Sequence, residues 1–199
     1  MRRRRARIAA CVGSLVLLLA ATGCAPIWSP INASTPAPFS LASIEAKAAL
    51  PRGWMSSTYE PVGGVWHFTR HGDELEQIFI RRWPKTQVVK GTNRAIRDGM
   101  TMQELAALSL DSRRLDDGVG MLVVQSNKPA EVGGRPCYRI DYTYRNAIGL
   151  PKRTVEYGCP VGTWMYRFEF NAPVQHYFAA GLPDFEALIE TVVFTVRGA

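Results

Sequence analysis

Outside its N-terminal end, the 199-residue chain has little net charge and few reactive side chains, with only three His and four Cys. Five of the 24 Lys and Arg residues lie within residues 2–7, and no Asp or Glu precedes Cys24, so the remaining 19 basic and 17 acidic residues leave a net charge of +2. This balance disfavours a nucleic-acid-binding protein, and we expect no nucleic acid among the partners. With 47% hydrophobic and 21% charged residues, the composition excludes a fibrous or wholly disordered chain.

Motifs that bind phosphates or carry a catalytic nucleophile are also missing. The chain has no Gly-x-Ser-x-Gly elbow, no Gly-Lys-Ser/Thr loop and no complete Gly-x-Gly-x-x-Gly turn. His67 and His71 lie four residues apart on a predicted strand, too far apart to bind one ion, and His176 lies among aromatic residues. We therefore expect no catalytic residue, no metal site and no cofactor, and rank an enzyme of unrecognised type last.

One long apolar run is present, at the N-terminus. It covers Ile8–Ala21, follows the cationic residues 2–7 and is interrupted only by Gly13 and Ser14. As a helix it spans about 21 Å, which is less than the roughly 30 Å hydrocarbon core of a bilayer. A charged region followed by a short apolar region predicts a signal peptide over residues 1–23.

The apolar run ends in Leu-Ala-Ala-Thr-Gly-Cys over residues 19–24, which resembles the lipobox of bacterial lipoproteins. The resemblance implies that Cys24 is acylated and becomes the first residue of a mature protein anchored in the lipid bilayer. The alternative is an ordinary cleaved signal followed by a free Cys. Ala25, rather than Asp, follows the Cys, and in a Gram-negative cell this implies an outer-membrane anchor facing the periplasm; in a cell with a single membrane the protein would lie at the surface.

Residues 25–40 contain four Pro and no charge, a composition typical of a semi-extended spacer. Together with Cys24 they predict a tether over residues 24–40, with a reach on the order of 50 Å. The rest of the chain, residues 41–199, has the length of one domain.

Apolar stretches alternate with turn signals in the predicted domain, which indicates an α+β fold. Strands are predicted at Gly53–Glu60, Val65–Arg70, Leu75–Trp83, Val119–Ser126, Cys137–Arg145, Lys152–Gly158 and Trp164–Phe170. The last four of these are expected to form one antiparallel meander. A helix is predicted over Met100–Arg114 with a capping box of Thr101 and Glu104, another starts after Pro183-Asp184, and Phe194–Val196 continues as a short strand.

Cys137 and Cys159 are the two cysteines left after Cys11, which lies in the signal peptide, and Cys24. In an oxidising compartment two such thiols are expected to pair. A hairpin turn at residues 146–151 supports this, because opposite residues then have numbers that sum to about 297, and the two Cys sum to 296. The alternatives are two free structural Cys or a metal site. The metal site is disfavoured because no His lies at CxxC-type spacing from these Cys.

Two registers of this hairpin, one residue apart, fit the sequence. Matching the apolar faces prefers a sum of 297, with Ile140 opposite Tyr157, and that register places the two Cys on opposite faces. A bulge at Gly158 would restore their common face.

Charged residues alternate with apolar ones on the same strands: Arg139, Asp141, Arg153, Glu156, Arg167 and Glu169. Cross-strand ion pairs are the simplest explanation of this pattern, ahead of acid and base catalysis. Arg139, Arg153 and Arg167, with nearby tyrosines, are also the one surface on which we predict binding of an anionic partner.

Four segments of the chain resemble the corresponding parts of the PsbP-like fold. They are Leu50–Trp54, Val132–Arg135, Trp164–Tyr166 and a terminal helix leading into Val193-Phe194. The resemblance covers residues 41–197 and implies an antiparallel sheet sandwiched between helices, in a protein that binds partners and has no catalytic activity.

The sequence thus favours a non-catalytic, membrane-anchored lipoprotein of the bacterial envelope, which binds or assists another envelope component. The alternative is a module that binds a small molecule or glycan.

Overall fold

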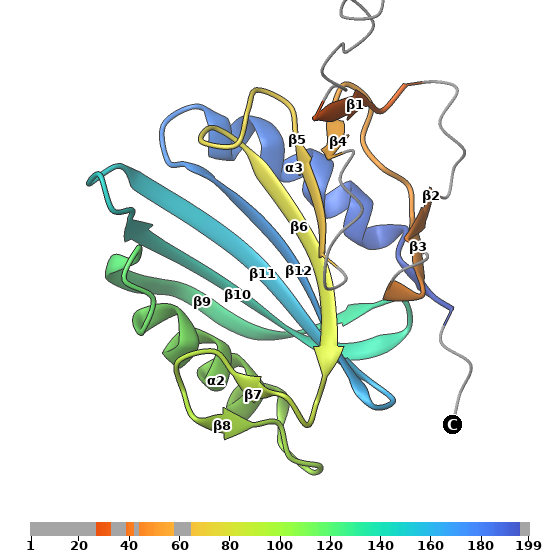
Figure 1. Ribbon diagram of the computed structural model, residues 1–199, viewed down its shortest axis with the longest axis vertical. Helices are drawn as coiled ribbons and strands as arrows, with labels where there is room; N and C mark the ends of the chain where they lie inside the picture. The colour runs from red at the N-terminus through yellow and green to blue at the C-terminus, as the bar shows by residue number, and fades with distance from the viewer. Residues whose placement is uncertain (1–26, 33–38, 42–43, 58–64, 196–199) are drawn as a thin grey trace, which may run out of the picture.

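An antiparallel sheet of eight strands, in the order β1-β4-β5-β6-β12-β11-β10-β9, forms the centre of the protein (Figure 1). The computed structural model describes residues 27–32, 39–41, 44–57 and 65–195. The strands of the large sheet are β1 (Trp28–Pro30), β4 (Met55–Ser57), β5 (Val65–Thr69), β6 (Gln77–Pro84), β9 (Gly120–Val132), β10 (Arg135–Arg145), β11 (Pro151–Val161) and β12 (Trp164–Pro173).

Two helices and two small sheets complete the described part of the chain. The helices are α2 (Met102–Arg114) and α3 (Tyr177–Glu190). The small sheets consist of β2 (Phe39–Leu41), β3 (Ala46–Ala48) and β13 (Val193–Phe194), and of β7 (Val88–Val89) and β8 (Arg94–Ala95). Figure 1 shows α2 and α3 on opposite sides of the large sheet, with the β7–β8 hairpin beside α2.

Alternation along the strands divides the core into two layers. On one face, Tyr138, Ile140 and Tyr142 of β10 pack with the apolar side of α2. On the other face, Phe168 and Phe170 of β12 pack with α3. Each face of the sheet is therefore covered by one helix, which confirms the predicted α+β class.

The predicted meander is confirmed for β9, β10, β11 and β12, but the sheet does not end there. Strand β12 also pairs with β6, which joins the meander to β5, β4 and β1. Strand β6 lies inside the sheet, between β5 and β12. Both of its faces carry large apolar groups, with Ile78 and Ile80 on one side and Phe79 and Trp83 on the other, as expected for a strand that is covered on both faces.

Helix α2 begins where the sequence predicts it. The Thr101 amide donates a hydrogen bond to the Glu104 carboxylate (2.7 Å), and the Glu104 amide donates one to Thr101 Oγ1 (3.2 Å). This capping box pairs backbone donors that the first turn of a helix otherwise leaves unpaired.

Helix α3 begins at Tyr177, six residues before Pro183, so the prediction that it starts after Pro183-Asp184 is wrong. Its first turns are held by the core: Phe178 lies 5.6 Å from the ring of Phe170. Gly181 allows this approach, because a Cβ atom there would lie 2.7 Å from Phe170 Cζ. The Pro signal is misleading because tertiary packing stabilises the helix on both sides of it.

Part of the predicted tether over residues 24–40 lies on the domain. Strand β1 pairs with β4, and the buried Ile31 donates its amide to the Trp54 carbonyl (2.7 Å). Pro30 is tolerated because β1 is an edge strand. The predicted signal peptide and Cys24 lie outside the described residues. No helix in the described ranges is long and apolar enough to cross a membrane.

Candidate functional site

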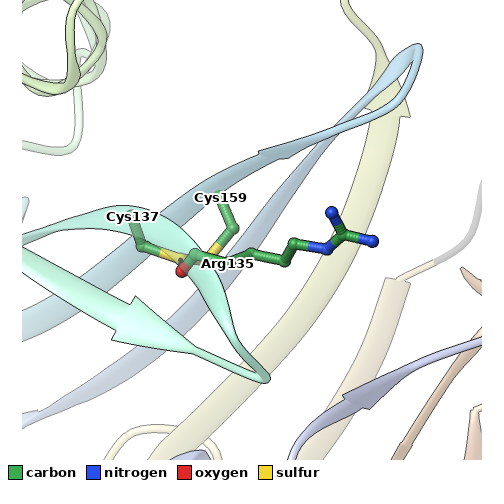
Figure 2. The surroundings of a disulfide bond; sticks show 3 residues. All are labelled: Arg135, Cys137 and Cys159. Carbon is green, nitrogen blue, oxygen red and sulfur yellow. Dashed lines mark hydrogen bonds between the residues drawn. A yellow bond between two sulfur atoms is a disulfide. The ribbon is translucent and has the colours of Figure 1, made fainter.

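The predicted disulfide between Cys137 and Cys159 is confirmed. The two sulfur atoms are 2.12 Å apart, and the Cα atoms are 4.4 Å apart. Figure 2 shows the two side chains meeting between neighbouring strands. The bond lies in the core on the α3 face and joins β10 to β11 at the open end of their hairpin.

The predicted β10–β11 register with a sum of 297 is wrong. Ile140 lies opposite Glu156, and Tyr138 lies opposite Gly158, so the sum is 296 along the whole ladder. The two Cys therefore share a face without a bulge at Gly158. Matching of apolar faces fails here because the face under α2 contains buried charges, including Glu156 at 0% exposure.

The three predicted partner-binding residues do not form one surface, and that part of the prediction is wrong. Arg139 and Arg153 belong to the α3 face. Arg167 belongs to the α2 face, where it is 8% exposed. Arg167 lies opposite Gly158 on β11, and Gly158 is five residues from Arg153 on that strand. Residues an odd number apart on a strand point to opposite faces, so Arg167 and Arg153 lie on opposite sides of the sheet.

On the α3 face, Arg153 makes a two-pronged ion pair. Its Nε and Nη2 atoms each donate to a different oxygen of Asp141, both at 2.8 Å. Its guanidinium also lies 4.6 Å from the centre of the Phe178 ring. The predicted cross-strand pairing of charges is confirmed for this pair.

Arg139 belongs to a second polar group on the same face. It donates to Tyr157 Oη (3.0 Å) and to Glu186 (2.8 Å), and Tyr157 donates to Glu186 (2.5 Å). Burial and the hydrogen bond to Glu186 raise the pKa of Tyr157 to about 12. These three side chains line an open groove of about 710 Å³, which we call the α3 groove. Its walls are residues 128–134 and the C-terminal part of α3.

The α2 face contains a set of buried charges that we call the charge cluster: Arg81, Arg113, Arg167, Glu156 and Glu169. Arg113 of α2 donates to Glu169 and lies 4.0 Å from Glu156. Arg167 lies 3.8 Å from Glu156 and 3.6 Å from Glu169.

Glu156 lies at the centre of the charge cluster and accepts two short hydrogen bonds at Oε1. The donors are Ser109 Oγ (2.6 Å) and Tyr138 Oη (2.7 Å). Burial raises the pKa of Glu156, and Arg113 opposes this effect. Burial also raises the pKa of Tyr138, so this hydroxyl stays protonated and donates.

Beside the charge cluster lies a hollow of about 300 Å³, which we call the Trp83 hollow. Its lining residues are Val65, Arg81, Arg82, Trp83, Pro84, Gln87, Val88, Val89, Lys90, Ser112 and Arg167. Four of these are basic and none is acidic, so its chemistry suits an anion.

The histidines are accounted for by local contacts. His67 stacks on Phe79 (4.3 Å between ring centres) and lies 3.4 Å from Asp73, whereas His71 lies 3.3 Å from Glu76. His176 has φ of 63° and precedes the first residue of α3. In the part of the chain that the structure describes, no group of three or more His, Cys, Asp and Glu is placed to hold a metal ion.

Sequence reasoning missed Arg81, Trp83, Ser109 and Arg113. Ser109 and Arg113 carry a signal, because they are four residues apart on the same side of the helix as the buried Leu105. Arg81 and Trp83 share one face of a strand, but their meaning depends on β12 as a neighbour, which the sequence does not reveal.

Comparison with known proteins identifies the fold. No protein-family model matches the chain, and no curated protein matches it.

Several solved structures are similar to this chain. A protein of Bacteroides thetaiotaomicron has a TM-score of 0.49 and 13% identity, over 79% of this chain and 47% of the Bacteroides protein. This chain therefore spans about half the length of that protein. The Ran-binding protein Mog1p of Saccharomyces cerevisiae has a TM-score of 0.53 and 7% identity, over 84% of this chain and 95% of its own. The cyanobacterial PsbP protein CyanoP of Synechocystis sp. PCC 6803 has a TM-score of 0.54 and 9% identity, over 86% of this chain and 95% of its own. The chain is thus similar in its fold to CyanoP and Mog1p, and that fold is PsbP-like.

Proposed function

We propose that the protein is a non-catalytic lipoprotein of the bacterial envelope, held at a membrane through acylated Cys24, whose domain binds another envelope protein. The lipobox-like residues 19–24 support the anchor. In a Gram-negative cell, Ala25 after the Cys favours the outer membrane, with the domain facing the periplasm.

The α3 groove is the observation that carries the binding function. Its lining carries charges of both signs, from Lys128, Glu131, Arg139, Glu186 and Glu190. Mixed charges in an open, polar groove suit another polypeptide surface better than a small apolar ligand. Of the predicted partner-binding residues, Arg139 lines this groove, Arg153 lies on the same face of the sheet, and Arg167 has no part in it.

The order of strands in the large sheet also favours the α3 groove as the binding surface. The large sheet begins with β1 and ends with β9, so the first described strand and the strand that lines the groove are its two edges. The proposed anchor precedes β1, whereas the α3 groove is lined by β9 at the other edge of the sheet. A partner could then reach the α3 groove while the protein stays tethered.

Site-specific crosslinking in cells tests this proposal. A photo-crosslinking residue is placed at Lys128 in the α3 groove and, as a matched control, at the exposed Arg97 on the other side of the sheet. We expect the residue placed at Lys128 to crosslink one envelope protein in a constant molar ratio, and the residue placed at Arg97 to crosslink none. Correctly localised protein that gives no adduct at Lys128, or the same adducts at both positions, would overturn the proposal.

A second candidate function is binding of a small molecule. It is favoured by the Trp83 hollow, which has the volume of a small-ligand pocket and lies on the face opposite the α3 groove.

A further inference from the structure

The Trp83 hollow has an uncompensated positive charge. Arg81 on β6 lies directly opposite Arg167 on β12. Like charges at directly opposite positions of an antiparallel pair destabilise a sheet. The charge cluster as a whole has three guanidinium groups and two carboxylates, which leaves one positive charge without a counterpart.

Arg81 is the residue that carries this excess. Arg113 and Arg167 each lie within 4.0 Å of a carboxylate oxygen, whereas Arg81 makes no such ion pair in the described ranges. In the charge cluster, the Nε atoms of Arg81, Arg113 and Arg167 and the Oε2 atom of Glu156 are buried and, among the described residues, have no hydrogen-bond partner. Of these residues only Arg81 and Arg167 line the Trp83 hollow. Buried donors are costly unless they are paired, and an anion in the hollow would supply acceptors to these two guanidinium groups.

The other basic residues of the lining are already paired. Arg82 forms an ion pair with Glu45, and Lys90 lies 3.7 Å from Asp116. The excess charge is therefore local to Arg81 and Arg167, and one singly charged group is enough to balance it.

Trp83 adds an apolar wall to the same site. Its ring centre lies 5.8 Å from the guanidinium carbon of Arg81 and 5.5 Å from that of Arg167. Val65, Val88 and Val89 also line the hollow. A ligand with both an anionic group and a flat apolar part would use the charges and the ring together.

We propose that the Trp83 hollow binds a small organic anion, whose carboxylate or phosphate accepts hydrogen bonds from Arg81 and Arg167 and whose apolar part packs on Trp83. The proposal rests on the second candidate function and names its ligand class. It is independent of the α3 groove.

Titration of the full chain, purified from membranes in detergent, tests the proposal. The probes are benzoate and phenyl phosphate, which separate a carboxylate from a phosphate, and phenyl glucoside as a neutral compound with the same ring. The readout is the indole N–H signal of Trp83 in NMR spectra, assigned by its loss in Trp83→Phe. Binding constants are compared for the wild type, for Arg81→Gln and for Arg135→Gln, an exposed control outside the hollow.

We expect at least one anion to bind the wild type and Arg135→Gln, and Arg81→Gln to bind it about 10-fold or more weakly, as for the loss of one charge-assisted hydrogen bond. Equal binding of phenyl glucoside would overturn the ligand class and leave the second candidate function in place. Failure of all three probes to bind folded protein would overturn both. Neither result affects the crosslinking test of the α3 groove.

Arg81→Gln also separates a ligand-binding role from a structural one. Because Arg81 makes no ion pair in the described ranges, this variant is expected to fold and to unfold at the wild-type temperature or above it. A lower unfolding temperature in the absence of anion would show that Arg81 stabilises the fold itself, and would contradict the proposal.

Discussion

Gly158 is the residue on which the centre of the charge cluster most directly depends. Tyr138 on the neighbouring strand lies across it, and a Cβ atom at Gly158 would lie 2.1 Å from Tyr138 Cζ and 2.4 Å from its hydroxyl oxygen. That hydroxyl donates to Glu156. The absence of a side chain at one position thus allows the buried carboxylate on the same strand to be paired.

Gly158→Ala should therefore destabilise the protein. We expect the free energy of unfolding to fall by about 2 kcal/mol or more, because the methyl group forces Tyr138 out of its position and Glu156 loses a donor. Denaturant unfolding measures this, with Gly120→Ala as a control, since a Cβ atom there makes only an ordinary contact of 3.7 Å. Equal stability of the two variants would show that Tyr138 can adopt another side-chain conformation without loss of stability.

His67 gives the fold a dependence on pH. Burial lowers its pKa below the usual 6.5, and Asp73 opposes this effect. The folded state therefore favours neutral His67, and the stability that it contributes is complete above pH 6.5 and is lost as the pH falls through the lowered pKa.

We expect His67→Gln to lose less stability than the wild type between about pH 7.5 and pH 5, because Gln does not take up a proton. Urea unfolding at several pH values gives both curves. Parallel curves would show that His67 titrates alike in the folded and unfolded states.

At the scale of elements, the sequence predicts strands and helix α2 well because their signals are local. Alternation marks β10 and β12, and the capping box of Thr101 and Glu104 marks the start of α2. The start of α3 and the β10–β11 register depend on contacts between distant residues, such as Phe178 with Phe170. A buried carboxylate opposite Ile140 violates the rule that like faces match, and it is stable only because Ser109 and Tyr138 pair with it.

The candidate site follows the same division. The cysteine pair is predictable because Cys137 and Cys159 lie at equal distances from the turn of one hairpin, which places them opposite each other. Arg81 and Arg167 are far apart in the chain and meet only through the pairing of β6 with β12. No local pattern reveals that pairing.

The disulfide is expected to stabilise the β10–β11 hairpin. Replacing both residues, in Cys137→Ser/Cys159→Ser, should lower the free energy of unfolding by about 3 kcal/mol, the value for a closed loop of this length in the chain-entropy model. Denaturant unfolding of the variant and of the oxidised wild type measures the difference. Equal stability of the two would mean that the hairpin keeps its order in the unfolded chain.

At the scale of the whole molecule, the two candidate sites are separated by the sheet. The α3 groove lies on one face and the Trp83 hollow on the other. Strands β1 and β9 form the two edges of the large sheet. The proposed partner and the proposed anion would therefore bind to different surfaces, without competition.

The intact mass of the mature protein extracted from membranes tests the proposed lipid anchor. We predict a chain that begins at Cys24 and carries the mass of a diacylglyceryl group and an added acyl chain, and a Cys24→Ser variant that carries no lipid and leaves the membrane fraction. A wild-type chain that begins at another residue, or that begins at Cys24 without lipid, would show that the protein has no such anchor.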